Sequence, residues 1–180
     1  MRDRAVTEEL DRSAAFWSRR GVMAVMVALS AGSVAGAPRS ETAPACQADR
    51  VTLISGIRQS SFTVELARTP EEQARGLMFR PFLPRDAGML FIMEPPRLAS
   101  FWMRNTMISL DLVFIDRAGR VVNVAARAVP YSEAPLRSEG EVRAVLEING
   151  GLAEALGIGP GTRAVHPVFD AAPAPYRCAG

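Results

Sequence analysis

The chain contains no lysine and a single histidine, and the absence of lysine by itself carries no functional conclusion. All 21 basic residues are arginines, scattered among 19 acidic residues, so the net charge is only +2. This pattern lacks the basic stripe that neutralises nucleic-acid phosphates. One histidine, His166, without neighbouring ligand residues does not make a metal site. We therefore predict no nucleic-acid partner, no metal and no cofactor.

Known catalytic motifs are also missing from the chain. It has no Walker-type loop, no Gly-x-Gly-x-x-Gly motif and no Ser-His-Asp pattern, so catalytic residues stay unknown. Several methionines lie among apolar strand residues, which favours core packing over copper binding. They are Met78, Met89, Met93, Met103 and Met107. The hydrophobic share of 48% and the 180-residue length indicate one globular domain with an extension.

A long uncharged stretch, residues 21–37, follows two adjacent arginines and ends in small residues. This is the layout of a secretory signal. Its strongly apolar part, residues 22–29, is shorter than the roughly 20 residues of a spanning helix, and an uncleaved anchor is the alternative. We predict cleavage after Ala35, because Pro38 would hinder cleavage after Ala37. The mature protein is expected to be periplasmic or secreted.

The export route stays open between two alternatives. Residues 18–23, with Arg19 and Arg20, resemble the twin-arginine signal, which carries substrates that are already folded. Paired arginines before an apolar run also occur in ordinary secretory signals, and a start at Met23 would delete the motif. Contact with the membrane is expected only through an uncleaved signal.

The two cysteines, Cys46 and Cys178, lie on either side of the whole domain. In an oxidising compartment they can form a disulfide. Closing a loop of about 130 residues would destabilise the unfolded chain by up to about 5 kcal/mol. Two alternatives stay open: an unpaired Cys178 in a mobile tail, and a lipid anchor on Cys46, for which residues 43–45 are a poor signal.

Composition divides the chain into four segments. Residues 1–37 are the export signal with a long N-terminal region, and residues 38–49, rich in Ala, Pro, Ser and Thr, are a linker. Residues 50–170 are predicted to form a single globular domain. Residues 171–180 are predicted to be a flexible tail.

Short apolar or alternating runs predict strands within the domain. They cover residues 51–54, 62–66, 89–93, 98–103, 107–116, 121–129, 142–148 and 163–168. Thr69, Pro70 and two glutamates predict a helix that ends near Gly76, and residues 149–156 predict another. Residues 131–141 are predicted to be a long surface loop. This order predicts an α+β fold with a mainly antiparallel, curled sheet or small barrel and one or two short helices.

Four blocks of the chain together resemble the domain of unknown function 192 family, which occurs in bacteria and archaea and is often exported. The blocks are residues 71–80 (EEQARGLMFR), 88–91 (GMLF), 101–116 (FWMRNTMISLDLVFID) with Gly119, and 145–147 (VLE) with Gly151. The resemblance implies no activity, because the family is named for lacking an established one. Arg104 and Ser109 stand where the family usually has lysine and proline.

Residues 101–106 form the densest mixture of aromatic and hydrogen-bonding side chains. Trp102 offers a stacking face, Arg104 a planar fork for a carboxylate or phosphate, and Asn105 and Thr106 can orient a ligand. The alternative interpretation is a tight turn at Arg104, Asn105 and Thr106, with the aromatic side chains in the core.

Two carboxylates, Asp111 and Glu147, each interrupt an apolar strand. A buried carboxylate needs a cation or several hydrogen-bond donors to remain charged, and Arg75, Arg80 and Arg104 are candidate partners. If the two carboxylates converge, one can act as acid and the other as base. The alternative is an arginine–carboxylate network that only orders the sheet.

The leading hypothesis is a non-enzymatic ligand-binding or accessory protein of the cell envelope, with a groove between residues 76–80 and 101–106. The candidate ligand-binding residues are Arg80, Trp102, Arg104, Asn105, Thr106, Asp111 and Glu147. One alternative is a hydrolase that uses Asp111 and Glu147 on an envelope component. The other is a structural partner protein with an exposed apolar patch. The expected partner is an unknown small molecule or envelope component.

Overall fold

The computed structural model describes residues 46–178. The predicted export signal, its cleavage site after Ala35, the twin-arginine motif and most of the predicted linker lie outside the described residues. Within residues 46–178, neither helix has the length and apolar character needed to cross a bilayer.

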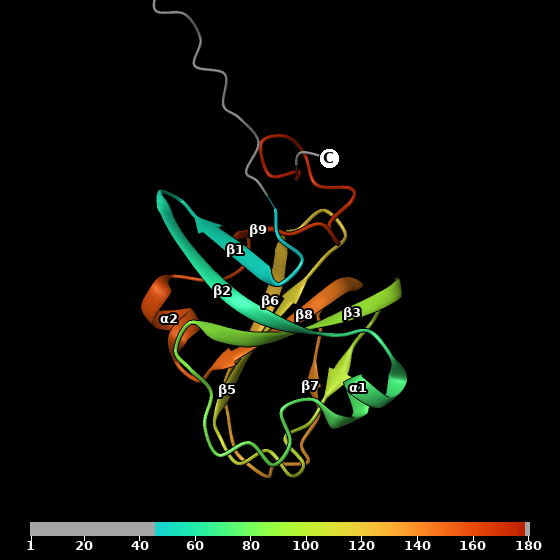
Figure 1. Ribbon diagram of the computed structural model, residues 1–180, viewed down its shortest axis with the longest axis vertical. Coiled ribbons are helices and arrows are strands. Elements are labelled where there is room, and N and C mark those ends of the chain that lie inside the picture. The colour runs from blue at the N-terminus through green and yellow to red at the C-terminus, as the bar shows by residue number, and fades with distance from the viewer. Residues whose placement is uncertain (1–45, 179–180) are drawn as a thin grey trace, which may run out of the picture. The chain divides into compact units, whose positions relative to one another are not determined.

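A seven-stranded sheet in the order β6-β5-β8-β3-β2-β1-β9 forms the framework of the fold (Figure 1). Its strands are β1 (Arg50–Ser55), β2 (Arg58–Ala67), β3 (Ala87–Arg97), β5 (Leu110–Ile115), β6 (Val121–Ala128), β8 (Val142–Asn149) and β9 (Arg163–Val165). Two short strands, β4 (Ser100–Phe101) and β7 (Leu136–Arg137), pair with each other. The helices are α1 (Pro70–Arg75) and α2 (Leu152–Leu156).

The predicted fold class is confirmed. The fold is mostly β with two short helices, and in the large sheet only β2 and β3 pair in parallel. The sheet curls into a half-barrel because β9 at one edge meets the turn that leads into β6 at the other. The backbone N–H of Ala164 donates to the carbonyl of Gly119 (2.6 Å), and Arg120 and Arg163 form an isolated bridge.

The turn at this meeting point requires glycine. Gly119 has φ of +72°, and a Cβ atom there would lie 2.6 Å from the carbonyl oxygen of Ala164. Both the left-handed backbone and the close approach of β9 exclude a larger residue. A single glycine therefore permits the two edges of the curled sheet to meet.

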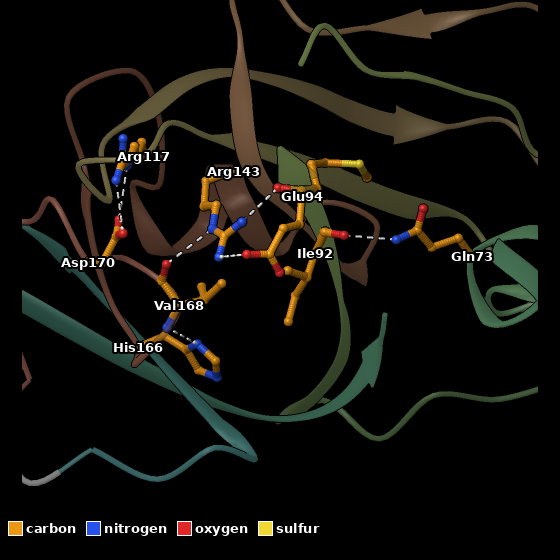
Figure 2. A network of polar contacts seen from close by, with 9 residues as sticks. Gln73, Ile92, Glu94, Arg117, Arg143, His166, Val168 and Asp170 are labelled. Carbon is orange, nitrogen blue, oxygen red and sulfur yellow. Dashed lines mark hydrogen bonds and ion pairs between the residues drawn. The ribbon is translucent and has the colours of Figure 1, made fainter. Parts of the chain in front are cut away.

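Helix α1 begins where the sequence predicts it. Thr69 and Glu72 form a capping box, and Pro70 occupies the first helical position. No residue of α1 is buried, so packing alone does not fix the helix to the sheet. Gln73 does so with a hydrogen bond from its side-chain amide to the carbonyl of Ile92 on β3 (2.8 Å), shown in Figure 2.

The large sheet is covered on both faces, and every residue of β5 is buried. One core cluster, which we call the α2-side core, includes Val113, Leu146, Ile148 and Leu152. The other, the loop-side core, contains Leu77, Phe91, Met103, Leu112, Phe114 and Val145. Alternate residues of β5 and β8 therefore point into different cores.

Two local predictions differ from the structure. The sequence predicts a strand over residues 98–103, but only Ser100 and Phe101 form one, and Leu98 is 69% exposed. Residues 171–178 were expected to be a flexible tail, yet Ala172 is fully buried in the α2-side core and Tyr176 packs against that core. Alanine and proline dominate residues 171–175, and this composition gave no sign of a packed segment.

Arg143 on β8 holds the segment before this tail, as Figure 2 shows. Its guanidinium donates to the carbonyl of Val168 (3.3 Å) and to that of Met93 (3.0 Å), and it forms an ion pair with Glu94. A second ion pair, between Arg117 and Asp170 (3.0 Å), lies close by. The C-terminal segment is thus bonded to the central strands of the sheet.

His166 is buried and has a structural role. Its Nε2 donates to the carbonyl of Ala48 (2.9 Å), and its Nδ1 accepts from the backbone N–H of Val168 (3.1 Å). Burial lowers the pKa of this imidazole, which favours the neutral form that makes both bonds. The histidine therefore connects the two ends of the described chain.

Cys46 and Cys178, which are 132 positions apart in the sequence, are bonded to each other in a disulfide. The bond joins the segment before β1 to the C-terminal segment. A cysteine in this bond has no thiol left for a lipid or a metal.

Replacing the disulfide should destabilise the domain. Cys46→Ser is expected to lower the free energy of unfolding by about 2 to 5 kcal/mol, because the unfolded chain is no longer constrained by the long loop. The measurement is urea unfolding with and without a thiol reductant. Reductant should destabilise the wild type and leave the variant unchanged, and a wild type that ignores full reduction would contradict this account.

Candidate functional site

A pocket of about 280 Å³ lies on the loop side of the sheet, between the end of α1 and the chain that follows β3. Its lining comes from residues 73–78, from β3, from residues 98–102, and from Thr106 and Glu147. The volume is close to the lower end of the range for small-molecule sites. Segments far apart in sequence thus enclose one cavity.

Glu147 forms the polar part of this pocket. Its strand β8 lies between β3 and β5, with Met89 and Leu112 as its direct cross-strand neighbours, and the residue is only 5% exposed. Among the described residues, none donates a hydrogen bond to its carboxyl group or forms an ion pair with it. Burial raises the pKa of this carboxyl to about 8, so it is mostly protonated at neutral pH.

The walls of the pocket are aromatic and apolar. The rings of Phe91 and Phe101 meet edge to face with centroids 5.0 Å apart, and Met93 lies beside them in the lining. Trp102 is half exposed at the mouth. The guanidinium of Arg104 stacks 4.4 Å from the centre of the Trp102 ring, which holds the indole in place.

Three residues around the mouth adopt left-handed backbone conformations although none is glycine. They are Phe79 (φ +62°), Asn105 (φ +54°) and Tyr131 (φ +61°). Backbone hydrogen bonds join their loops, from Phe79 N–H to the Asn105 carbonyl (2.9 Å) and from Tyr131 N–H to the Thr106 carbonyl (3.1 Å). Such conformations cost about 1 to 3 kcal/mol each and concentrate at functional sites.

Two arginines in the lining, Arg75 and Arg97, are exposed at the mouth. Arg97 donates to the side chain of Gln73 (3.3 Å), and neither arginine forms an ion pair with a described residue. Neither contributes to the raised pKa of Glu147, whose cause is burial alone. The pocket therefore combines a cationic mouth with an uncompensated carboxyl group deeper inside.

Asp111 does not belong to this pocket. It pairs with Ile148 across β5 and β8, whereas Glu147 pairs with Leu112, so the two carboxyl groups point to opposite faces of the sheet. The hypothesis that they converge as an acid–base pair is wrong.

The Asp111 carboxylate is fully buried on the α2 side of the sheet. It accepts hydrogen bonds from the backbone N–H groups of Arg127 (2.7 Å), Gly151 (2.9 Å) and Ala153 (2.7 Å). The carboxylate thereby ties β6 to the start of α2.

The arginine cluster that the sequence suggested around Asp111 and Glu147 is not formed. Arg80 makes a two-pronged ion pair with Glu65, and Arg104 makes one with Glu133 (3.0 Å). Both arginines are partly exposed, and both pairs lie away from Glu147. Of the seven predicted ligand-binding residues, three line the pocket: Trp102, Thr106 and Glu147.

Residues 103–106 form a tight turn, with the N–H of Thr106 donating to the carbonyl of Met103 (3.1 Å). Asn105 supplies its left-handed residue and is exposed. The Thr106 hydroxyl is buried and donates to the carbonyl of Arg104 (3.3 Å). The turn alternative thus describes the backbone here, while Trp102 lies at the pocket mouth rather than in the core.

The sequence reasoning missed several residues of the lining, among them Gln73, Phe91, Met93 and Arg97. Phe91 and Met93 belong to an apolar run that is buried on both faces, so no periodicity marks which residues face a cavity. Among residues 46–178, no three His, Cys, Asp or Glu side chains are grouped so as to hold a metal ion.

Comparison with known proteins identifies the family of this chain. Residues 52–166 match the model of the DUF192 family, described as "Uncharacterized ACR", so the chain belongs to that family. No curated protein matches the chain.

Two solved structures show the same fold. A protein of unknown function from Novosphingobium aromaticivorans DSM 12444 is 53% identical, with a TM-score of 0.63 over 64% of this chain and 82% of that one. A Sinorhizobium meliloti 1021 protein, named as a proposed transcription regulator, is 39% identical, with a TM-score of 0.63 over 67% of this chain and 95% of that one.

The raised pKa of Glu147 predicts how stability depends on pH. Between the ordinary pKa of 4.5 and the raised value of about 8, the folded protein keeps a proton that the unfolded chain releases. Glu147 therefore lowers the free energy of unfolding by about 1.4 kcal/mol for each pH unit in this window.

Glu147→Gln should remove this slope, so the variant gains stability over the wild type as pH rises from 5 to 8 (about 1.4 kcal/mol per unit). Urea unfolding at several pH values measures the difference. Glu139→Gln, at an exposed carboxyl, is the matched control and should follow the wild type. Parallel curves for the wild type and Glu147→Gln would refute the buried, unpaired state of this group.

Proposed function

We propose that this protein is an exported binding protein and that its pocket over Glu147 holds a small organic molecule. The observation that carries the proposal is a carboxyl group 5% exposed, without a protein partner, that lines a 280 Å³ pocket. Burying a polar group without a hydrogen bond costs about 1 to 3 kcal/mol. A fold retains such a cost where a bound molecule supplies the missing partner.

Features of the mouth support the same function. The exposed apolar side chains of the domain include Phe79, Leu98, Trp102 and Tyr131, and Leu98 and Trp102 line the pocket directly. The loops that carry Phe79 and Tyr131 are hydrogen-bonded to residues 105–106 at the mouth. Exposed apolar groups beside a cavity favour contact with a ligand over contact with water alone.

The hydrolase alternative loses its geometric basis, because a two-carboxylate mechanism needs both groups in one cleft. The Asp111 carboxylate accepts hydrogen bonds from three backbone N–H groups on the other face of the sheet. A structural partner protein would present an apolar patch in place of a cavity, whereas here two of the exposed apolar side chains, Leu98 and Trp102, line one.

Export is part of the proposal, and the disulfide supports it. Bonds such as Cys46–Cys178 persist in oxidising compartments and are rare in the cytosol. The apolar leader before the described residues fits the same location. The envelope location in turn suggests that the ligand is a molecule met outside the cytoplasm.

Ligand binding should raise the melting temperature of the protein. We expect a thermal-shift screen of residues 36–180, which retain both cysteines and the whole described core, to find small organic binders. A ligand at 100 times its Kd stabilises by about 2.7 kcal/mol. Trp102 is the only tryptophan in this segment, so its fluorescence reports occupancy of the pocket directly.

The locus of binding is tested with a matched pair of variants. Ala74→Phe places a ring at an exposed position of the lining and should weaken every true pocket ligand at least about tenfold, which is about 1.4 kcal/mol. Ala126→Phe adds the same ring at an exposed position of β6 and should leave binding unchanged. Ligands that bind equally to both variants, or a screen without any binder, would refute the pocket function.

Export is tested with a reporter. Residues 1–45 fused to an enzyme that is active only after export should yield activity outside the cytoplasm. Replacing Arg19 and Arg20 together with lysine should abolish this activity for twin-arginine export and preserve it for the general route. Activity confined to the cytoplasm with every fusion would refute export.

A further inference from the structure

The polar content of the pocket points to one chemical class of ligand. Two polar side chains in its lining are buried, Thr106 and Glu147. The Thr106 hydroxyl already donates to a backbone carbonyl, whereas the Glu147 carboxyl has no partner among residues 46–178. A ligand group that reaches the inner part of the pocket therefore meets Glu147 first.

An ammonium group is the partner that satisfies a buried carboxyl most fully. Its positive charge stabilises the ionised carboxylate, which the apolar surroundings otherwise disfavour, and its N–H groups donate charge-assisted hydrogen bonds. A neutral hydroxyl would supply the hydrogen bond but not the charge. An anionic group would meet a carboxyl that becomes repulsive as soon as it ionises.

The walls favour a cation for a second, independent reason. The rings of Phe91, Phe101 and Trp102 all lie in the lining, and those of Phe91 and Phe101 meet edge to face. A cation within about 6 Å of such a ring gains roughly 0.5 to 2 kcal/mol, and more when it is removed from water. An apolar ligand body would pack against the same rings and against Met93.

The charged residues around Glu147 do not replace such a cation. On β3 and α1 the charged residues in the lining are Arg97 and Arg75, and both are exposed at the mouth. The lining residues from the segment after β3, residues 98–106, carry no charge. Glu147 is thus the one titratable group in the buried part of the lining.

We propose that the pocket binds an organic ammonium ion with an apolar body, whose ammonium group pairs with the ionised carboxylate of Glu147. This inference rests on the proposed small-molecule function. The two arginines at the mouth leave room for a ligand that also carries an anionic group at its far end.

Binding of such a cation is coupled to proton release. Glu147 starts mostly protonated, because its pKa is about 8, and it must ionise to pair with the ammonium group. At pH 7 about 0.9 proton per bound cation is therefore released to solvent. The apparent Kd of a cation should fall about tenfold from pH 6 to pH 7 and level off above pH 8.

The experiment compares charged probes with neutral probes of the same shape. Butylammonium and phenethylammonium are titrated into residues 36–180 beside butan-1-ol and 2-phenylethanol, with phenylacetate as the anion. Trp102 fluorescence gives Kd between pH 6 and pH 9, and calorimetry in two buffers of different ionisation enthalpy gives the protons released. The ammonium ions should bind at least about tenfold more tightly than the alcohols at pH 8.

Glu147→Gln is the decisive variant, since its amide keeps the shape and a hydrogen bond but cannot ionise. It should bind the ammonium ions at least about tenfold more weakly, abolish their proton release and leave the alcohols within about threefold of the wild type. Far-ultraviolet circular dichroism and urea unfolding establish that the variant is folded.

Three outcomes would overturn the ammonium proposal: equal binding of ammonium ions and alcohols, no proton release, or binding of phenylacetate in preference to both. Binding of the alcohols or of phenylacetate that Ala74→Phe abolishes would leave the small-molecule function intact while removing the ammonium class. Absence of binding by every probe also overturns the ammonium proposal, and the library screen then decides the small-molecule function separately.

Discussion

The desolvation of one carboxyl group, Glu147, is the constraint on which the interpretation of this protein depends. Strand β8 lies in the middle of the large sheet, so a side chain that points to either face leaves water. On the loop side, Glu147 meets aromatic rings and thioethers and no cation. The low-dielectric surroundings therefore keep the group mostly neutral at physiological pH.

Comparison with Asp111 shows why burial alone does not define a functional group. Both carboxyls are almost inaccessible, and they stand on neighbouring strands. Asp111 accepts three backbone hydrogen bonds and is thereby fully occupied in joining β6 to α2. Glu147 accepts none from the described residues, and it lines a cavity instead. The two carboxyl groups therefore differ in whether the protein itself supplies their hydrogen-bond donors.

Membership in the DUF192 family supports the fold of this protein but assigns it no activity, because the 53% identical relative is itself a protein of unknown function. Function must therefore be argued from the site. The features of the mouth are consistent with one another: left-handed residues at Phe79, Asn105 and Tyr131, hydrogen bonds between their loops, and an indole held by Arg104. Each of these three features holds the backbone or a side chain in a fixed position beside the pocket mouth, outside the two hydrophobic cores.

The sequence by itself determined the fold class, most strand positions, the capped start of α1 at Thr69 and Pro70, and the family. These follow from local patterns, because side-chain periodicity and turn chemistry act over a few residues. It also indicated that residues 76–80 and 101–106 border a common site, and residues 76–78 with Phe101, Trp102 and Thr106 do line one pocket. Tertiary structure alone decided which carboxylate enters that pocket. A shift of one residue in register between β5 and β8 would place Asp111 and Glu147 on the same face, and register is set by pairing between strands that are distant in sequence.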